Sequence, residues 1–274
     1  MAGRRGPAYT LPMSESTGPP DAAATDRDGA RDTGSRARAL VTGGAVRVGR
    51  QISLALARAG YDVAVHYNRS VEDARRMRTN LEMLGAQTLA LQADLARPEE
   101  IEALFAVVGD RWGSLDLLVN NAAVFPGGAP ESIGLDDWDH VFALNLRAPF
   151  FCAVRARALM TRGAIINIAD IAAWEAWPGH VPYAASKAGL VSLTLGLAQA
   201  WAPDVRVNAV APGAVMLPEG ASDEKLEQAE RRALLHRVGT PEDVAEAVVF
   251  LAGAKFVTGE ILRVDGGAHV ARSR

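Results

Sequence analysis

The stretch Ala37–Gly49 reads ARALVTGGAVRVG and determines the expected fold. A short apolar strand, Ala37–Val41, runs directly into a glycine-rich turn, and apolar residues at helical spacing follow from Ile52. Strand, turn and helix in this order are the context that a dinucleotide-binding fingerprint requires. Gly43 permits a tight turn, and Gly49 lets the start of the helix approach a pyrophosphate, which the helix dipole and backbone N–H groups attract. We therefore expect a dinucleotide site at this turn.

The same alternation of strand and helix continues along the chain. Further strands are predicted at Asp62–Tyr67, Thr88–Gln92, Leu115–Val119, Ala164–Ala169, Val205–Val210 and Ile261–Val264. Helices are predicted near Ile52, at Val71–Leu84, from Pro98, and at Leu135–Met160, Tyr183–Trp201, Met216–Arg237 and Pro241–Leu251. This pattern predicts an α/β fold: one Rossmann-type, doubly wound domain with a seven-stranded parallel sheet and helices on both faces.

Composition divides the chain into a tail and this domain. Residues 1–36 are rich in Gly, Pro, Ser, Asp and Arg, which predicts a disordered tail, and residues 37–274 form the predicted α/β domain. Within it, the charged segment Met216–Arg237 is a candidate substrate lid.

The overall composition favours a soluble protein with a large core. Of the 274 residues, 49% are hydrophobic, and the net charge of −3 gives no general attraction to nucleic acid or membrane. There is no apolar run of about 20 residues, the length needed to span a membrane. Cys152 is the only cysteine and lies in an apolar helical run, so we expect it in the core and the protein in the cytoplasm.

The end of the second strand indicates which dinucleotide binds. An acidic residue there would select NAD, and His66–Ser70 contains none. Arg69 and Ser70, with Arg47 near in space, suit a 2′-phosphate, although a solvated surface arginine is the alternative. We therefore expect NADPH, held by the following residues: Gly43, Arg47, Val48, Gly49, Tyr67, Asn68, Arg69, Ser70, Asp94, Leu95, Asn121, Ala122, Lys187, Pro212 and Gly213.

Four residues are candidates for proton transfer. Tyr183 and Lys187 are four positions apart and share one helix face, so the ammonium should lower the pKa of the phenol. Asp170 ends the preceding strand, where it can point at the same substrate. Asn145 lies inside a predicted helix, for which asparagine is a poor residue, and this suggests a functional kink. No metal is expected.

Together these residues resemble the short-chain dehydrogenase/reductase family from about Ala37 to Val270. The resemblance depends on the glycine-rich turn at 42–49, the Asn-Asn-Ala-Ala run at 120–123, Asn145, Tyr183 with Lys187, Pro212-Gly213 and the Val-Asp-Gly-Gly run at 264–267. It implies that Tyr183 donates or accepts a proton, that Lys187 binds the nicotinamide ribose, and that Asn145 holds a water. This chain departs from the family pattern at Asp170, where a serine is usual.

The departures resemble the pteridine and dihydromonapterin reductases. Arg47, the His-Tyr-x-Arg-Ser run at 66–70, Asp170 and Phe125 carry this resemblance. It implies that Phe125 and the nicotinamide sandwich a pterin ring, and that Arg47, Asp170, Tyr183 and a neighbouring subunit's C-terminal arginine, at the position of Arg272, complete the substrate site of a homotetramer. Ala123 departs from the serine usual there.

From the residues themselves, an ionised Asp170 cannot donate to a ketone oxygen. It can accept from ring N–H groups, or hold the Tyr183 proton in place by raising the pKa of the phenol. We therefore expect NADPH-dependent reduction of pterins or folates. One alternative is a carbonyl reductase of the same fold, for 3-oxoacyl-carrier-protein or sugar-ketone substrates. The other is a non-catalytic NADPH-binding regulator.

Overall fold

The computed structural model describes residues 36–216, 220 and 222–271. The predicted tail therefore lies outside the described residues except for Arg36, and so does Arg272. The strands are β1 (Ala37–Val41), β2 (Tyr61–Tyr67), β3 (Thr88–Gln92), β4 (Leu117–Asn120), β5 (Gly163–Ile168), β6 (Val205–Pro212) and β7 (Ile261–Val264). The α-helices are α1 (Arg47–Arg58), α2 (Val71–Met83), α3 (Pro98–Trp112), α4 (Leu135–Phe142), α5 (Ala148–Ala158), α6 (Val181–Trp201), α7 (Asp223–Arg232) and α8 (Pro241–Gly253).

The seven strands form one parallel sheet in the order β3-β2-β1-β4-β5-β6-β7, which confirms the predicted fold. The chain winds outward in both directions from β1, which pairs with both β2 and β4. Ligands of open α/β sheets bind at such a switch point, beyond the carboxyl ends of the strands.

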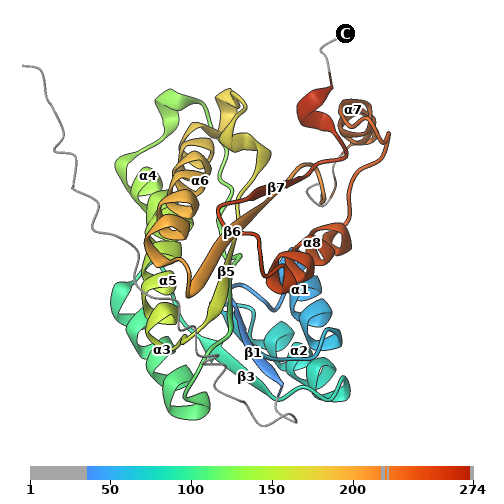
Figure 1. Cartoon of the computed structure of the whole chain (residues 1–274). Helices are drawn as coiled ribbons and strands as arrows, with labels where there is room; N and C mark the ends of the chain where they lie inside the picture. The colour runs from blue at the N-terminus through green and yellow to red at the C-terminus, as the bar shows by residue number, and fades with distance from the viewer. Residues whose placement is uncertain (1–35, 217–219, 221, 272–274) are drawn as a thin grey trace, which may run out of the picture. The chain divides into compact units, whose positions relative to one another are not determined.

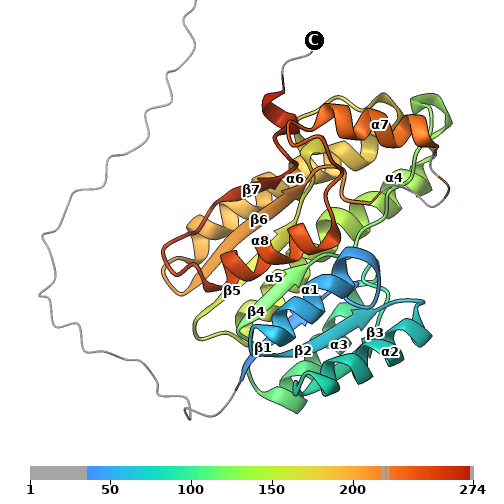
Figure 2. The same cartoon turned by 90° about the vertical axis from the view of Figure 1, so that its right-hand side faces the viewer.

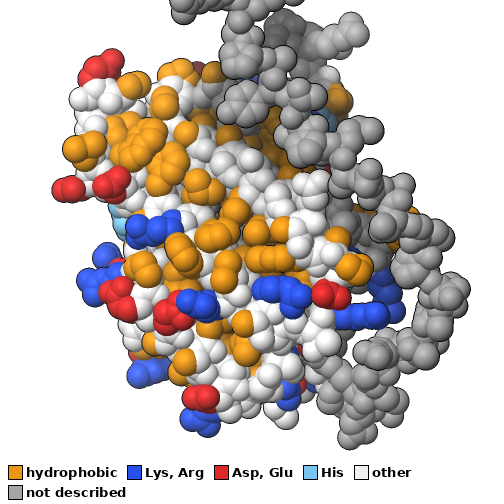
Figure 3. All heavy atoms as spheres, turned by 60° about the vertical axis from the view of Figure 1, so that its left-hand side comes forward, with side chains coloured by type: hydrophobic (Ala, Val, Ile, Leu, Met, Phe, Trp, Pro, Cys, Tyr) orange, Lys and Arg blue, Asp and Glu red, His pale blue; other side chains and the backbone are white. Residues whose placement is uncertain are grey.

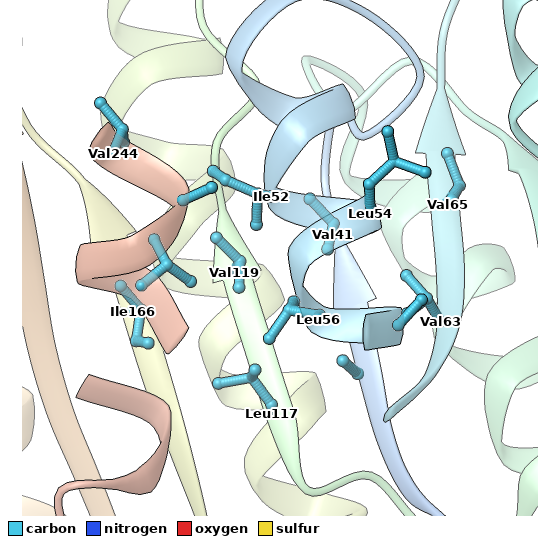
Figure 4. Close-up of a cluster of buried hydrophobic side chains, with 14 of the residues drawn as sticks. Val41, Ile52, Leu54, Leu56, Val63, Val65, Leu117, Val119, Ile166 and Val244 are labelled. Atoms are coloured by element: carbon cyan, nitrogen blue, oxygen red, sulfur yellow. The ribbon is translucent and has the colours of Figure 1, made fainter. Parts of the chain in front are cut away.

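Helices cover both faces of the sheet. Helices α1, α2 and α8 lie on one face, and α3, α4, α5 and α6 lie on the other (Figures 1 and 2). On the first face, Ile52 and Leu56 of α1 and Val244 of α8 pack on strand residues such as Val119 and Ile166 (Figure 4). Burying a side chain of this size stabilises the fold by roughly 1.5–3 kcal/mol. This packing fixes the position of α1, and with it the position of the glycine-rich turn before α1.

Several predicted boundaries were wrong, most of them by one or two residues. Strand β4 begins at Leu117, not Leu115, because the Leu115 N–H donates to the Leu159 carbonyl oxygen at 3.0 Å and not to a neighbouring strand. The predicted helix Leu135–Met160 is broken by a π-helical turn at Ala143–Arg147 and ends at Ala158. Helix α7 covers only Asp223–Arg232, and Ala233 returns to extended backbone.

Two expectations from composition can be compared with the structure. Cys152 is fully buried in the core, as predicted, and burial raises the pKa of its thiol to about 12. Within the described ranges, no helix is long and apolar enough to cross a membrane, and no group of acidic, histidine or cysteine side chains could hold a metal ion.

Candidate active site

A cleft of about 1460 Å³ opens beyond the carboxyl ends of the strands. It brings together eighteen of the predicted site residues: Gly43, Arg47, Val48, Gly49, Tyr67, Asn68, Arg69, Ser70, Asp94, Leu95, Asn121, Ala122, Phe125, Asp170, Tyr183, Lys187, Pro212 and Gly213. Asn145 is buried and does not line the cleft.

The glycine-rich turn is bonded to the loop that follows β4. The Thr42 hydroxyl oxygen accepts from the backbone N–H groups of Asn121 at 2.9 Å and Ala122 at 3.0 Å. The Asn121 side-chain amide donates back to the carbonyl oxygens of Thr42 and Gly43 at 2.9 and 3.2 Å. A Cβ at Gly49 would collide with the Gly43 carbonyl oxygen, so only glycine fits this close start of α1. The cradle fits the pyrophosphate of a dinucleotide.

His66 is a part of this cradle that was expected only as a member of the 66–70 run and not as a site residue. Its Nδ1 accepts from the Gly43 backbone N–H at 3.0 Å, and its Nε2 lies 3.0 Å from the Ala93 carbonyl oxygen. Burial lowers the pKa of His66 to about 4, so at neutral pH the ring is uncharged and donates from Nε2. A histidine in an otherwise apolar, buried strand was the signal that could have revealed it.

The predicted 2′-phosphate site is cationic. Arg47 and Arg69 line the cleft with Ser70, and no described residue forms an ion pair with either guanidinium. Arg47 has a positive φ of 51°, a conformation rare for a non-glycine residue. This unfavourable backbone conformation occurs at the turn that directs the Arg47 side chain into the cleft.

Helix α6 places Tyr183 and Lys187 on one face at the inner end of the cleft. The Tyr183 hydroxyl donates to Oδ2 of Asp170 at 2.8 Å, and the Lys187 Nζ donates to the Ile168 carbonyl oxygen at 2.8 Å. Asp170 also caps the turn after β5, because its Oδ1 accepts from the Ala172 N–H at 2.8 Å. Strand β5 and helix α6 thus position Asp170, Tyr183 and Lys187 close together.

The electrostatics of this group correct one expectation. Burial raises the pKa of Tyr183, and the charge and hydrogen bond of Asp170 raise it further, so the prediction of a lowered value was wrong. Burial also raises the pKa of Asp170, which outweighs the hydrogen bonds and the Lys187 charge that favour its ionised form. Burial lowers the pKa of Lys187 to about 8, and the Asp170 charge partly opposes this. The phenol therefore holds its proton firmly.

Asn145 lies in the π-helical turn that separates α4 from α5. Its side-chain amide donates to the Val124 carbonyl oxygen and accepts from the Val124 N–H, each at 2.9 Å. The same amide lies 3.3 Å from the Ser186 hydroxyl, which donates to the Tyr183 carbonyl oxygen at 2.6 Å. A π-bulge at such a position is frequent near functional sites. The predicted kink at Asn145 is confirmed, and the water remains a prediction.

Aromatic rings line the cleft beside Tyr183. Phe125 is 52% exposed; it stacks on His180 at 4.1 Å between ring centroids and meets the Tyr183 ring edge-on at 4.6 Å. Trp177 completes the group with its ring centroid 6.2 Å from that of Phe125. Phe125 is therefore a cleft residue and not a core residue. Trp177 and His180 belong to this aromatic group, although no sequence motif indicated either residue.

Comparisons with known proteins identify the family. A family profile described as enoyl-(acyl carrier protein) reductase matches residues 44–269. A 3-oxoacyl-(acyl-carrier-protein) reductase of Staphylococcus aureus is 38% identical over 240 residues, covering 85% of this chain and 98% of the relative. A solved short chain dehydrogenase of Burkholderia cenocepacia in complex with NADP is 35% identical with a TM-score of 0.81, covering 85% of this chain and 98% of that chain. The angucycline C-6 ketoreductase LanV with bound NADP is 32% identical with a TM-score of 0.81, covering 86% and 96%. The chain belongs to the short-chain dehydrogenase/reductase family.

The family resemblance is thus confirmed, but its finer assignment is not. The relatives named here with a stated reaction are ketoreductases. They favour the carbonyl-reductase alternative over the pteridine-reductase resemblance, which they do not support.

Proposed function

We propose that the protein is an NADPH-dependent ketoreductase acting on 3-oxoacyl compounds. The observation that carries this proposal is the pair of Tyr183 and Lys187 in the dinucleotide cleft, with Asn145 buried behind it. The chain that holds them covers 98% of the length of a 3-oxoacyl-(acyl-carrier-protein) reductase. The enzyme is an oxidoreductase and its cofactor is NADPH, the phosphorylated dinucleotide present as NADP in two structural relatives. When bound, NADPH supplies the hydride.

The chain's own residues supply the proton and the positioning. Tyr183 donates its proton to the carbonyl oxygen, and Lys187 holds the nicotinamide ribose and later assists reprotonation. Asn145 orders the loop after β4 on which the substrate lies. Asp170, in its protonated form, donates to the same carbonyl oxygen as the usual serine would, and its raised pKa favours that form.

The pterin class is a second candidate, favoured by a different observation. An ionised Asp170 beside Tyr183 is an acceptor suited to ring N–H groups, and the exposed ring of Phe125 offers a surface for a flat heterocycle. In this candidate Tyr183 protonates a ring nitrogen while hydride reaches the adjacent carbon. Arg47 would contact the ring from the glycine-rich turn.

A substrate panel separates the two candidates. The consumption of NADPH would be followed with 3-oxoacyl thioesters, simple β-ketoesters, dihydropterins and dihydrofolate at equal concentrations. We expect kcat/KM for a 3-oxoacyl thioester to exceed that for every pterin by at least about tenfold. Turnover of pterins alone would establish the second candidate, and NADPH binding without any turnover would establish the non-catalytic regulator.

Cofactor selectivity gives a separate prediction. We expect Arg69→Ala to reduce the preference for NADPH over NADH by up to about a hundredfold, because a charge-assisted contact to the 2′-phosphate contributes up to about 3 kcal/mol. The loss should fall on kcat/KM for NADPH and leave that for NADH unchanged. Arg50→Ala is the matched control, because Arg50 is exposed on α1 outside the cleft. Equal effects of the two substitutions would contradict the assignment.

The assembly of the protein is part of the proposal. Figure 3 shows hydrophobic side chains spread over the face that carries α4 and α5. Trp138 and Phe150 are exposed on these helices, and a hollow of about 810 Å³ between α4, α5 and α6 includes Phe150. Such a surface supports the proposed homotetramer. A cytoplasmic location, a lid at 216–237 and a role for Arg272 stay predictions.

A further inference from the structure

Helix α7 separates its charges between two faces. Lys225, Gln228, Ala229 and Arg232 follow the spacing of one helical face, and all four line the cleft. The acidic residues of the helix lie outside the cleft lining: Asp223, Glu224, Glu227 and Glu230. Arg231 also lies outside it and pairs with Glu227 at 3.2 Å. The helix therefore presents cations and an amide to the cleft and carboxylates away from it.

The other cations at this end of the cleft are already engaged. Arg232 pairs with Glu175 at 2.8 Å, and Arg237 pairs with Asp243 at 2.7 Å. Arg263 lies over the Trp174 ring at 4.3 Å. No described residue forms an ion pair with Lys225, so its ammonium is the cation of α7 that remains for a ligand.

The position of α7 indicates that its cations lie near the substrate end of the cleft and not near the expected 2′-phosphate site. Figures 1 and 2 place α7 at the end of the molecule where the loops after β4 and β5 lie. Those loops carry Phe125, which meets the Tyr183 ring edge-on, and Asp170, which accepts from the Tyr183 hydroxyl. The cations expected to meet the 2′-phosphate, Arg47 and Arg69, come instead from the turns after β1 and β2.

We propose that Lys225 and Gln228 form a subsite for an anionic group, a phosphate or carboxylate, at the end of the substrate remote from the reacting carbonyl. This inference rests on the proposed ketoreductase function. Lys225 attracts the anion, Gln228 donates to it from the next turn, and the Arg232–Glu175 pair holds α7 against the loop after β5. The reacting end of the substrate then reaches Tyr183 while its far end stays at α7.

A matched pair of substrates tests the subsite. Acetoacetyl-pantetheine and acetoacetyl-4′-phosphopantetheine share the reacting ketone and differ by one remote phosphate. With the full-length protein we expect the phosphorylated compound to have a KM about tenfold lower, with similar kcat, and this advantage should shrink as salt screens the charges. Equal KM values would overturn the inference and leave the ketoreductase proposal intact. Failure to reduce either compound would overturn both.

Two variants with the same change of charge locate the effect. Lys225→Glu should raise the KM for the phosphorylated compound about tenfold and leave the KM for the neutral one unchanged. Arg231→Glu changes the charge equally on the outer face and should have no such effect. A carboxylate-bearing 3-oxo thioester in place of the phosphate shows which anion is preferred. A raised Kd for NADPH in Lys225→Glu would assign the subsite to the cofactor and overturn the inference.

Discussion

Replacing Tyr183 by phenylalanine is expected to lower kcat by roughly 10²- to 10⁴-fold, the usual range for removing a positioned general acid. The variant lacks the hydroxyl that donates to Asp170 at 2.8 Å and that is the proposed proton donor in the cleft. Its ring keeps the edge contact with Phe125, so the shape of the cleft is preserved. The Kd for NADPH should stay within about threefold, because Lys187 remains bonded to the Ile168 carbonyl oxygen. Single-turnover measurement of NADPH oxidation separates the chemical step from binding.

A small effect would identify a different proton donor. If kcat fell by less than about tenfold, Asp170 or solvent would have to protonate the product. The matched control is Tyr61→Phe, which removes a phenol at the start of β2, outside the cleft. This control should change kcat little.

Asp170→Ser should change the two candidate reactions in opposite directions. Ketone reduction near neutral pH should rise about tenfold, because serine always offers a hydroxyl to the carbonyl oxygen and Asp170 does so only when protonated. Pterin reduction should fall by about ten- to a hundredfold, because a charge-assisted acceptor worth about 1.5–3 kcal/mol is lost. The two kcat/KM values measured on one preparation decide between the candidates. Equal activity of variant and wild type on every substrate would leave Asp170 as a cap for the Ala172 N–H.

The pH profile gives the sign of the Asp170 contribution. Burial raises the pKa of Asp170, so the carboxyl stays protonated to higher pH than usual. If the neutral acid assists ketone reduction, wild-type kcat/KM falls as the pH rises through this pKa, and Asp170→Ser lacks that fall. If the carboxylate assists pterin reduction, wild-type activity rises over the same interval. Asp170→Asn, neutral and nearly isosteric, should follow the serine variant in losing the titration.

The sequence predicted those features that depend on local pattern. The order of strands and helices follows from hydrophobic periodicity, and the positions of Tyr183 and Lys187 follow from helical spacing. The glycine-rich turn was recognisable because Gly49 must approach the Gly43 carbonyl oxygen more closely than a side chain allows.

Features that depend on tertiary contacts were not accessible in the same way. The net direction of the Tyr183 pKa depends on burial and on the distance to Asp170, neither of which spacing reveals. His66 acts on Gly43 from a neighbouring strand, 23 positions further along the chain. The extent of α7 depends on where packing ends the helix, since good helix formers such as Ala233 and Leu234 continue the sequence beyond Arg232. Substrate class was the weakest inference because Asp170 suits one substrate when ionised and another when protonated.

The bonds around the glycine-rich turn have a thermodynamic consequence for nucleotide affinity. Thr42, Asn121 and His66 hold the backbone of this turn through contacts internal to the protein. Ordering a flexible residue costs roughly 1–2 kcal/mol of conformational free energy, and here that cost is met when the chain folds. The dinucleotide therefore encounters amide groups that are already oriented, so most of its interaction energy is retained as affinity. Removing the hydrogen bonds of Thr42, Asn121 or His66 should therefore weaken nucleotide binding, because the turn would then have to be ordered when the nucleotide binds. This holds even where the side chain itself does not contact the phosphates.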